Sequence, residues 1–256
     1  MTQNGFYVTL PSNASAQVYP KNQIWNYRTK LAKAIVLSEP HEVGLVEFQY
    51  PRVWYSFPKT DAVVKVYNGK NRVKSAFTMD IGVYESIQAI VKAFNARIST
   101  NTQLEGVSMH YSSVKNRVYF LGSTEDSTIT FVGRLATILG FKDGEAFPLP
   151  TTDRSHITPY PADIHAGCYT FYIYSDIVDY QLVGDSHVPL LRCINVAAEQ
   201  RRIPTLTYDR PQYTSLSKNV IDDIEISIKN DQNGYIPFLY GKVIAKLHFR
   251  PIKQRF

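Results

Sequence analysis

The sequence contains few of the residues from which catalytic and metal centres are built. Only two cysteines occur among its 256 residues, Cys168 and Cys193, too few for a disulfide framework or a four-ligand zinc site. The six histidines are dispersed, and no His-x-His pair occurs. Serine-nucleophile elbows, His-Glu-x-x-His zinc helices and phosphate-binding glycine loops are also missing. We therefore expect no catalytic residue, no metal site and no cofactor.

Two small clusters of ionisable residues are possible exceptions. Asp163 and His165 lie on one side of an extended segment, but two ligands make an incomplete metal site, and a surface pair is the better interpretation. Asp222, Asp223 and Glu225 adjoin the start of an expected strand, where aspartate is common in turns. No second acidic cluster faces them by spacing, so they are interpreted as structural.

Long apolar runs are missing as well. No segment approaches the run of about eighteen apolar residues that a membrane-spanning helix needs. The first residues lack the charged and apolar regions of a secretory signal, so we expect no membrane span and a protein made inside the cell rather than secreted. The formal charge is +6. Because Lys and Arg form no dense run, no specific nucleic-acid contact is expected.

Strand-like alternation is what the chain has in abundance, and it is clearest in residues 221–250. Isoleucines alternate with polar residues from Ile224 to Ile228, and apolar residues alternate again from Val243 to Phe249. Asn233-Gly234 between them favours a tight turn. This stretch predicts an antiparallel hairpin whose two strands lay apolar faces on one core.

Similar patterns recur along the rest of the chain. Further strands are expected at residues 6–10, 27–37, 43–50, 62–67, 72–79, 107–111, 117–121, 129–131, 168–177 and 190–196. Many short strands separated by turn residues are typical of a sandwich or barrel. We expect the eight-strand, two-sheet jelly roll.

The apolar period changes in the middle of the chain. Residues 83–98 carry apolar side chains at three- and four-residue spacing, as in an amphipathic helix. Leu135–Leu139 predicts a short helix that ends at Gly140. The predicted fold is therefore mainly β. Residues 1–61 and 151–256 form a jelly-roll antiparallel β-sandwich, and residues 62–150 form an inserted α+β excursion that contains the helices.

Aromatic residues are the remaining candidates for a functional role, since the chain has eighteen tyrosines. Tyrosine and tryptophan are enriched at protein interfaces and also stack on sugars or bases. For a chain without catalytic groups, subunit contact is the simpler explanation. The candidate subunit-interface residues are Trp54, Tyr55, Tyr172, Tyr174 and Tyr213.

Several segments resemble the minor capsid (penton) protein of Polinton/Maverick elements and the related adintoviruses. In the first part of the chain they are Phe6–Asn13, Glu42–Pro51 with Trp54-Tyr55, and Leu139–Phe141. In the second part they are Tyr174–Val178, Val183–Arg192, Pro211–Tyr213, Gly241–Val243 and Leu247–Arg250. The resemblance rests on their order and joint presence along nearly the whole chain.

This resemblance implies a structural viral capsid protein with a jelly-roll fold. Such a protein forms a homopentamer at the five-fold vertices of an icosahedral shell, beside trimers of a double jelly-roll major capsid protein. It implies no enzyme activity and no cofactor, and it implies a location in the virion capsid after synthesis in the host cell.

Two other functions stay open from the residues alone. The first is a carbohydrate-binding β-sandwich module that uses Trp25, Trp54 or nearby tyrosines as stacking platforms. The second is a jelly-roll enzyme with a metal site built from dispersed histidines and aspartates, among them His165. We rank it third because the residues that would complete a ligand set are missing.

Overall fold

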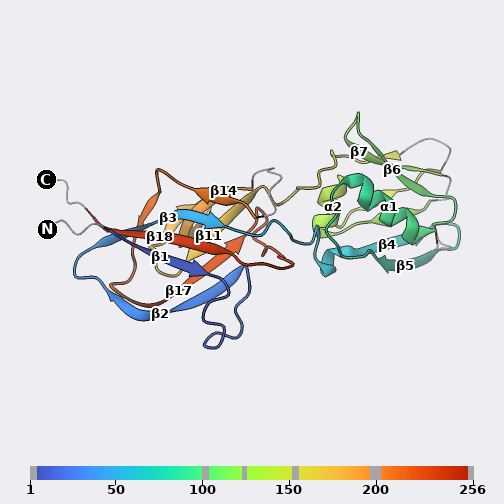
Figure 1. Ribbon diagram of the computed structural model, residues 1–256. Helices are drawn as coiled ribbons and strands as arrows, with labels where there is room; N and C mark the ends of the chain where they lie inside the picture. Colours follow the sequence, from blue (N-terminus) through green and yellow to red (C-terminus); the bar gives the residue numbers. More distant parts are fainter. Residues whose placement is uncertain (1–4, 100–103, 123–125, 152–155, 197–202, 253–256) are drawn as a thin grey trace. The chain divides into compact units, whose positions relative to one another are not determined.

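The computed structural model describes residues 5–99, 104–122, 126–151, 156–196 and 203–252. The chain divides into two compact units (Figure 1), unit 1 formed by residues 1–54 with 168–256 and unit 2 by residues 55–167. Unit 2 is wider than the insertion of residues 62–150 expected from the sequence. Phe57 before that range and Ala162 and Ala166 after it are buried in the core of unit 2, which explains the difference.

The first sheet of unit 1 is antiparallel and has the strand order β1-β18-β3-β15, with β16 also paired to β3. Its strands are β1 (Phe6–Pro11), β18 (Ile244–Pro251), β3 (His41–Gln49), β15 (Thr205–Thr207) and β16 (Tyr213–Ser215). Residues of β18 alternate between the buried Ala245, Leu247 and Phe249 and the more accessible side chains between them. One face of the sheet is therefore apolar and the other polar.

The second sheet of unit 1 is also antiparallel and has the order β14-β11-β17-β2. Its strands are β14 (Leu190–Asn195), β11 (Thr170–Ser175), β17 (Val220–Lys229) and β2 (Asn26–Val36). In β11, Phe171 and Ile173 are buried, whereas Tyr172 and Tyr174 lie on the opposite face. The same period of two residues therefore separates core from surface in both sheets.

The order of the strands identifies the topology. If β15 and β16, which both pair with β3, are counted as one interrupted strand, the eight strands in chain order form sheets 1-8-3-6 and 2-7-4-5. Successive strands thus alternate between the two sheets along much of the chain, which is the arrangement of a jelly roll. The fold class predicted from the sequence is confirmed.

The predicted hairpin of residues 221–250 is wrong in one respect. β17 pairs with β2 and β11, whereas β18 pairs with β1 and β3, so the two strands belong to opposite sheets. The Asn230 side chain accepts hydrogen bonds from the backbone amides of Gln232 and Gly234 and closes the turn. The chain then crosses to the other sheet, because apolar alternation specifies a buried face but not the neighbouring strand.

The core of unit 1 lies between its two sheets. The Tyr27 hydroxyl of the second sheet is buried and donates a hydrogen bond of 3.0 Å to the Leu10 carbonyl of the first sheet. This bond satisfies a polar group that would otherwise be costly to bury. The large buried side chains of this core include Leu45, Phe48, Tyr50, Phe171, Ile173, Ile224, Ile226, Ile228, Leu247 and Phe249.

Unit 2 has its own sheets, helices and core. One sheet has the order β5-β4-β8-β9 and another the order β10-β7-β6. The strands are β4 (Val63–Asn68), β5 (Val73–Thr78), β6 (Ser108–Ser112), β7 (Arg117–Leu121), β8 (Thr128–Thr130), β9 (Ala146–Pro148) and β10 (His156–Ile157), and a 3-10 helix η1 (Lys59–Ala62) precedes them. The hairpin predicted around Asn68-Gly69 is present as β4 and β5.

Both predicted helices are present. α1 (Ile87–Ile98) begins after Ser86, whose hydroxyl accepts a hydrogen bond from the Ala89 amide, and it buries one apolar stripe. The Asn95 side chain bonds both the amide and the carbonyl of Met109, which ties α1 to β6. α2 (Gly133–Leu139) ends at Gly140 in the left-handed conformation. Within the part of the chain that the structure describes, neither helix has the length and apolar character to cross a membrane.

Gly140 provides a test of this architecture. Its φ is +81°, and an added Cβ would lie 2.2 Å from the Tyr160 carbonyl oxygen, so Gly140→Ala combines backbone strain with a backbone clash. We expect it to lower the free energy of unfolding by about 3 kcal/mol or more. Gly144→Ala is the matched control, because its φ is +68° and nothing lies within 4 Å of the added Cβ. The control should cost only about 1 kcal/mol. Equal losses in chemical denaturation would show that the Tyr160 contact is unimportant.

Candidate assembly surfaces

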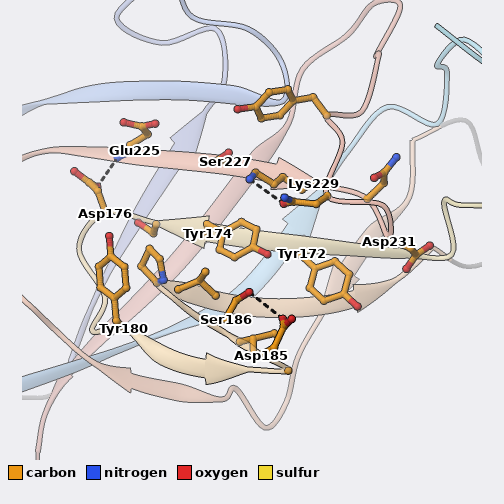
Figure 2. Close-up of a pocket in the computed structure, with 18 residues that line it drawn as sticks. Tyr172, Tyr174, Asp176, Tyr180, Asp185, Ser186, Glu225, Ser227, Lys229 and Asp231 are labelled. Atoms are coloured by element: carbon orange, nitrogen blue, oxygen red, sulfur yellow. Dashed lines mark hydrogen bonds between the residues drawn. The ribbon is translucent and has the colours of Figure 1, made fainter. Parts of the chain in front are cut away.

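A groove of about 850 Å³ lies on the outer face of the second sheet of unit 1. It runs between strands β11 and β17 and the small hairpin of β12 (Gln181–Val183) and β13 (Ser186–Val188). Tyr172 and Tyr174 project into it from β11, on the same side as Asp185 and Ser186 (Figure 2). We call this hollow the tyrosine groove. Alternation along β11 places these rings outside because Phe171 and Ile173 occupy the core.

The tyrosine groove combines aromatic rings with unequal charge. Four carboxylates line it, from Asp176, Asp185, Glu225 and Asp231, against the single lysine Lys229. Burial, together with the neighbouring Cys193 and Tyr172, raises the pKa of the Tyr174 hydroxyl. That hydroxyl therefore remains a neutral hydrogen-bonding group at physiological pH.

The groove already holds one cation of its own. The Lys229 ammonium lies 5.7 Å from the ring centroid of Tyr174 and 5.8 Å from that of Tyr235. It also donates a hydrogen bond of 2.9 Å to the Asn233 side chain. Cation–π contacts of this kind contribute about 0.5–1 kcal/mol at exposed sites. The rings of the groove thus present faces that attract positive charge.

Two of the four carboxylates are balanced by cations. Arg28 lies 3.4 Å from Asp176 and also contacts Glu225, and Lys218 lies 3.0 Å from Asp176. Within the described residues, Asp185 and Asp231 have no cation within ion-pair distance. Asp185 bonds the Ser186 hydroxyl, and Asp231 accepts the amides of Tyr169 and Thr170. Negative charge is therefore left at these two positions of the tyrosine groove.

The first sheet carries a different row of rings on its outer face. His248 of β18 lies between Tyr7 of β1, at 4.6 Å between ring centroids, and Tyr213 of β16, at 5.8 Å. The Tyr213 hydroxyl and His248 Nδ1 share a hydrogen bond of 2.7 Å. The Arg250 guanidinium lies 3.4 Å from the Tyr213 centroid and bonds Glu42 at 2.6 Å. We call these residues the histidine row. Unlike the tyrosine groove, its charges are paired.

The structure distributes the five predicted interface residues over three places. Tyr172 and Tyr174 line the tyrosine groove, and Tyr213 lies in the histidine row. Trp54 instead packs edge-on against Phe171 and Phe238 at the margin of the core. Tyr55 is half-buried and belongs to unit 2.

Other residues of these surfaces were missed from the sequence. Alternation along residues 6–10 and 243–249 placed Tyr7 and His248 away from the core, but it gave no sign that β1, β18 and β16 would bring them together. The β12–β13 hairpin was also not expected, although Gly184 with a φ of +61° marks its turn. That hairpin adds Asp185 to the tyrosine groove.

The ionisable residues considered for metal binding or catalysis make local or structural contacts. The Asp163 carboxylate accepts the backbone amide of His165, a local turn interaction. Across the described ranges, no three His, Cys, Asp or Glu side chains gather closely enough to hold a metal ion. Asp223 bonds the Tyr19 hydroxyl and Arg28, and these bonds outweigh the effect of burial and lower the pKa of its carboxyl.

Comparison with known proteins gives a result at the level of the fold. No protein-family model matches the sequence, and no curated protein matches it. Among solved structures, the mavirus penton protein matches with a TM-score of 0.50 at 12% identity, over 98% of this chain and 100% of that one. This chain has the fold of the mavirus penton protein. A chain from the Sputnik virophage structure matches with a TM-score of 0.45 at 10% identity, over 96% of this chain and 98% of that one.

The histidine row predicts a pH dependence. Burial and the nearby Arg250 lower the pKa of His248 below 6.5, so the unfolded chain binds the proton more readily than the folded chain. This contribution to stability is complete above the unfolded pKa and is lost as the pH falls toward the folded pKa. We expect the free energy of unfolding to fall less steeply between about pH 7 and pH 5 in His248→Gln than in the wild type.

Chemical denaturation at several pH values measures this difference. His187→Gln, which removes an exposed imidazole from the β12–β13 hairpin, is the control and should follow the wild-type profile. Parallel pH profiles for the wild type and His248→Gln would contradict the assignment.

Proposed function

We propose that this chain is a structural capsid protein, the penton subunit that forms a homopentamer at the five-fold vertices of an icosahedral shell. The observation that carries the proposal is the fold shared with the mavirus penton protein over 98% of this chain. The sequence resemblance to the penton proteins of Polinton/Maverick elements and adintoviruses supports the same role. On this proposal the chain is not an enzyme, resides in the virion capsid and is made in the host cell.

The two outer faces of the jelly roll support assembly into a ring. In a closed ring each subunit contacts its two neighbours through two different surfaces. The tyrosine groove lies on the outer face of one sheet and the histidine row on the outer face of the other. Tyr172, Tyr174 and Tyr213 are therefore our proposed interface anchors. Trp54 remains an interface candidate with less support because it packs against Phe171 and Phe238, and so does Tyr55 because it belongs to unit 2 and lies in neither surface.

The other partner proposed for this chain is a double jelly-roll major capsid protein, whose trimers would surround the vertex. The carbohydrate-binding alternative has less support from the side chains. Trp25 stacks on Tyr235 at 3.8 Å between ring centroids, and Trp54 packs edge-on against Phe171. Each indole is thus already engaged by another ring, whereas a sugar platform needs an open ring face.

Oligomeric mass tests the function directly. Native mass spectrometry of the chain, alone and coexpressed with a major capsid protein, should give a species of five times 29.2 kDa. Persistent monomers in both samples would contradict the proposal. Quenching of tryptophan fluorescence by glycans in such a monomer would favour the carbohydrate-binding module instead.

Truncating the proposed anchor tyrosines tests whether the two outer faces of the jelly roll form the subunit interface. The double variant Tyr172→Ser, Tyr174→Ser and the single variant Tyr213→Ser should each weaken assembly by about 30-fold or more, because a buried tyrosine anchor contributes about 2 kcal/mol or more. Their melting temperatures should fall only modestly, since all three rings lie outside the core and lose only surface contacts. Tyr160→Ser, at an exposed tyrosine of unit 2, is the matched control. Assembly that is equally strong in all variants would show that these faces are not the interface.

A further inference from the structure

All the charged residues of the β4–β5 hairpin of unit 2 are basic. Residues 63–78 contain Lys65, Lys70, Arg72 and Lys74 and no aspartate or glutamate. All four basic side chains are exposed, and none forms an ion pair with any residue that the structure describes. We call this element the basic hairpin. Four unpaired positive charges on one short hairpin repel one another, so an acidic surface would stabilise them.

The backbone register presents these charges together. Lys74 pairs across the hairpin with Tyr67, and Lys65 pairs with Ala76, so the two lysines share the outer face of the strands. Lys70 and Arg72 lie in the turn between the strands, where Arg72 has a φ of +55°. The basic hairpin thus offers charge at its turn and along one face.

The tyrosine groove has the opposite charge. Its lining holds four carboxylates and one lysine. Arg28 and Lys218 balance two of the carboxylates from outside the lining, which leaves Asp185 and Asp231 without a cation among the described residues. Lys229 illustrates how the groove accommodates a cation, between the faces of Tyr174 and Tyr235. Lysine and arginine from another molecule would meet the same combination of ring faces and carboxylates.

We infer that the basic hairpin of one copy docks into the tyrosine groove of a second copy. The inference rests on the proposed function, because an assembling subunit requires two different surfaces that complement each other. The whole chain carries a formal charge of +6, so two copies repel at long range. Docking therefore depends on the local pairing of the hairpin cations with Asp185 and Asp231 and on tyrosine contacts.

Charge reversal with rescue tests the contact. The groove variant combines Asp185→Lys, Ser186→Lys and Asp231→Asn, which changes the net charge of the lining from −3 to +1. The Asp231→Asn substitution keeps a side-chain oxygen that accepts the Tyr169 and Thr170 amides. The hairpin variant combines Lys70→Glu, Arg72→Glu and Lys74→Glu, which changes the hairpin from +4 to −2. All the changed side chains are exposed, so both variants should fold.

Self-association is measured by sedimentation velocity at low salt for each variant alone, for their mixture and for the combined sextuple variant. Each variant alone should associate at least about tenfold more weakly than the wild type, because its groove and hairpin now repel. The mixture and the sextuple variant should recover association, because each again contains oppositely charged surfaces. Association of the wild type should weaken with added salt, which screens exposed charges.

The matched control is Glu39→Lys with Asp209→Lys, two exposed carboxylates of unit 1 outside the groove, and it should associate as the wild type does. Loss of association in the control, or no recovery in the mixture, overturns the inference. A monomeric wild type overturns it as well. A pentamer that forms equally in all variants supports the proposed function and overturns the groove contact. Association that follows the charges without forming pentamers supports the contact and counts against the ring.

Discussion

The constraint on which the whole jelly roll depends is that each of its two sheets buries only one face. Strands such as β11 and β18 therefore alternate between buried and accessible residues, and the apolar residues of both sheets meet in one core between them. The buried hydrogen bond from the Tyr27 hydroxyl to the Leu10 carbonyl joins the two sheets across this core. The same alternation places Tyr172, Tyr174 and His248 outside. The surfaces proposed for assembly are therefore a direct consequence of how the core is built.

This dependence explains why most elements could be predicted from the sequence. The period of two residues marks strands such as β1, β3 and β11, and the three- and four-residue spacing of apolar residues marks α1. Gly140 ended α2 as expected because its left-handed backbone suits glycine. Pairing was harder. β17 and β18 are consecutive strands joined by residues 230–243, yet they belong to different sheets, and the alternation within each strand does not show which strand it pairs with.

The candidate surfaces were less predictable from the sequence, because alternation shows which side chains lie outside the core but not which of them come together. Alternation identified Tyr172 and Tyr174 as side chains outside the core, and they do line the tyrosine groove. Asp185 and Asp231 could not be assigned to that groove because they reach it from separate turns, one after β12 and one after β17. Trp54 has an aromatic signal as strong as that of Tyr172, but it packs against Phe171. Residue type alone does not distinguish a core margin from an interface.

The position of β18 also constrains the order in which the protein folds during synthesis. In the part of the chain that the structure describes, β18 is the only strand that pairs with β1, and it lies between β1 and β3. The first strand to be synthesised can therefore pair only after the last strand has been made, and in this pairing Phe6 lies opposite Phe249. Unit 2 has its own core and is complete at residue 167. We expect it to fold first on the ribosome, while the jelly-roll strands on either side of it remain open until β18 emerges.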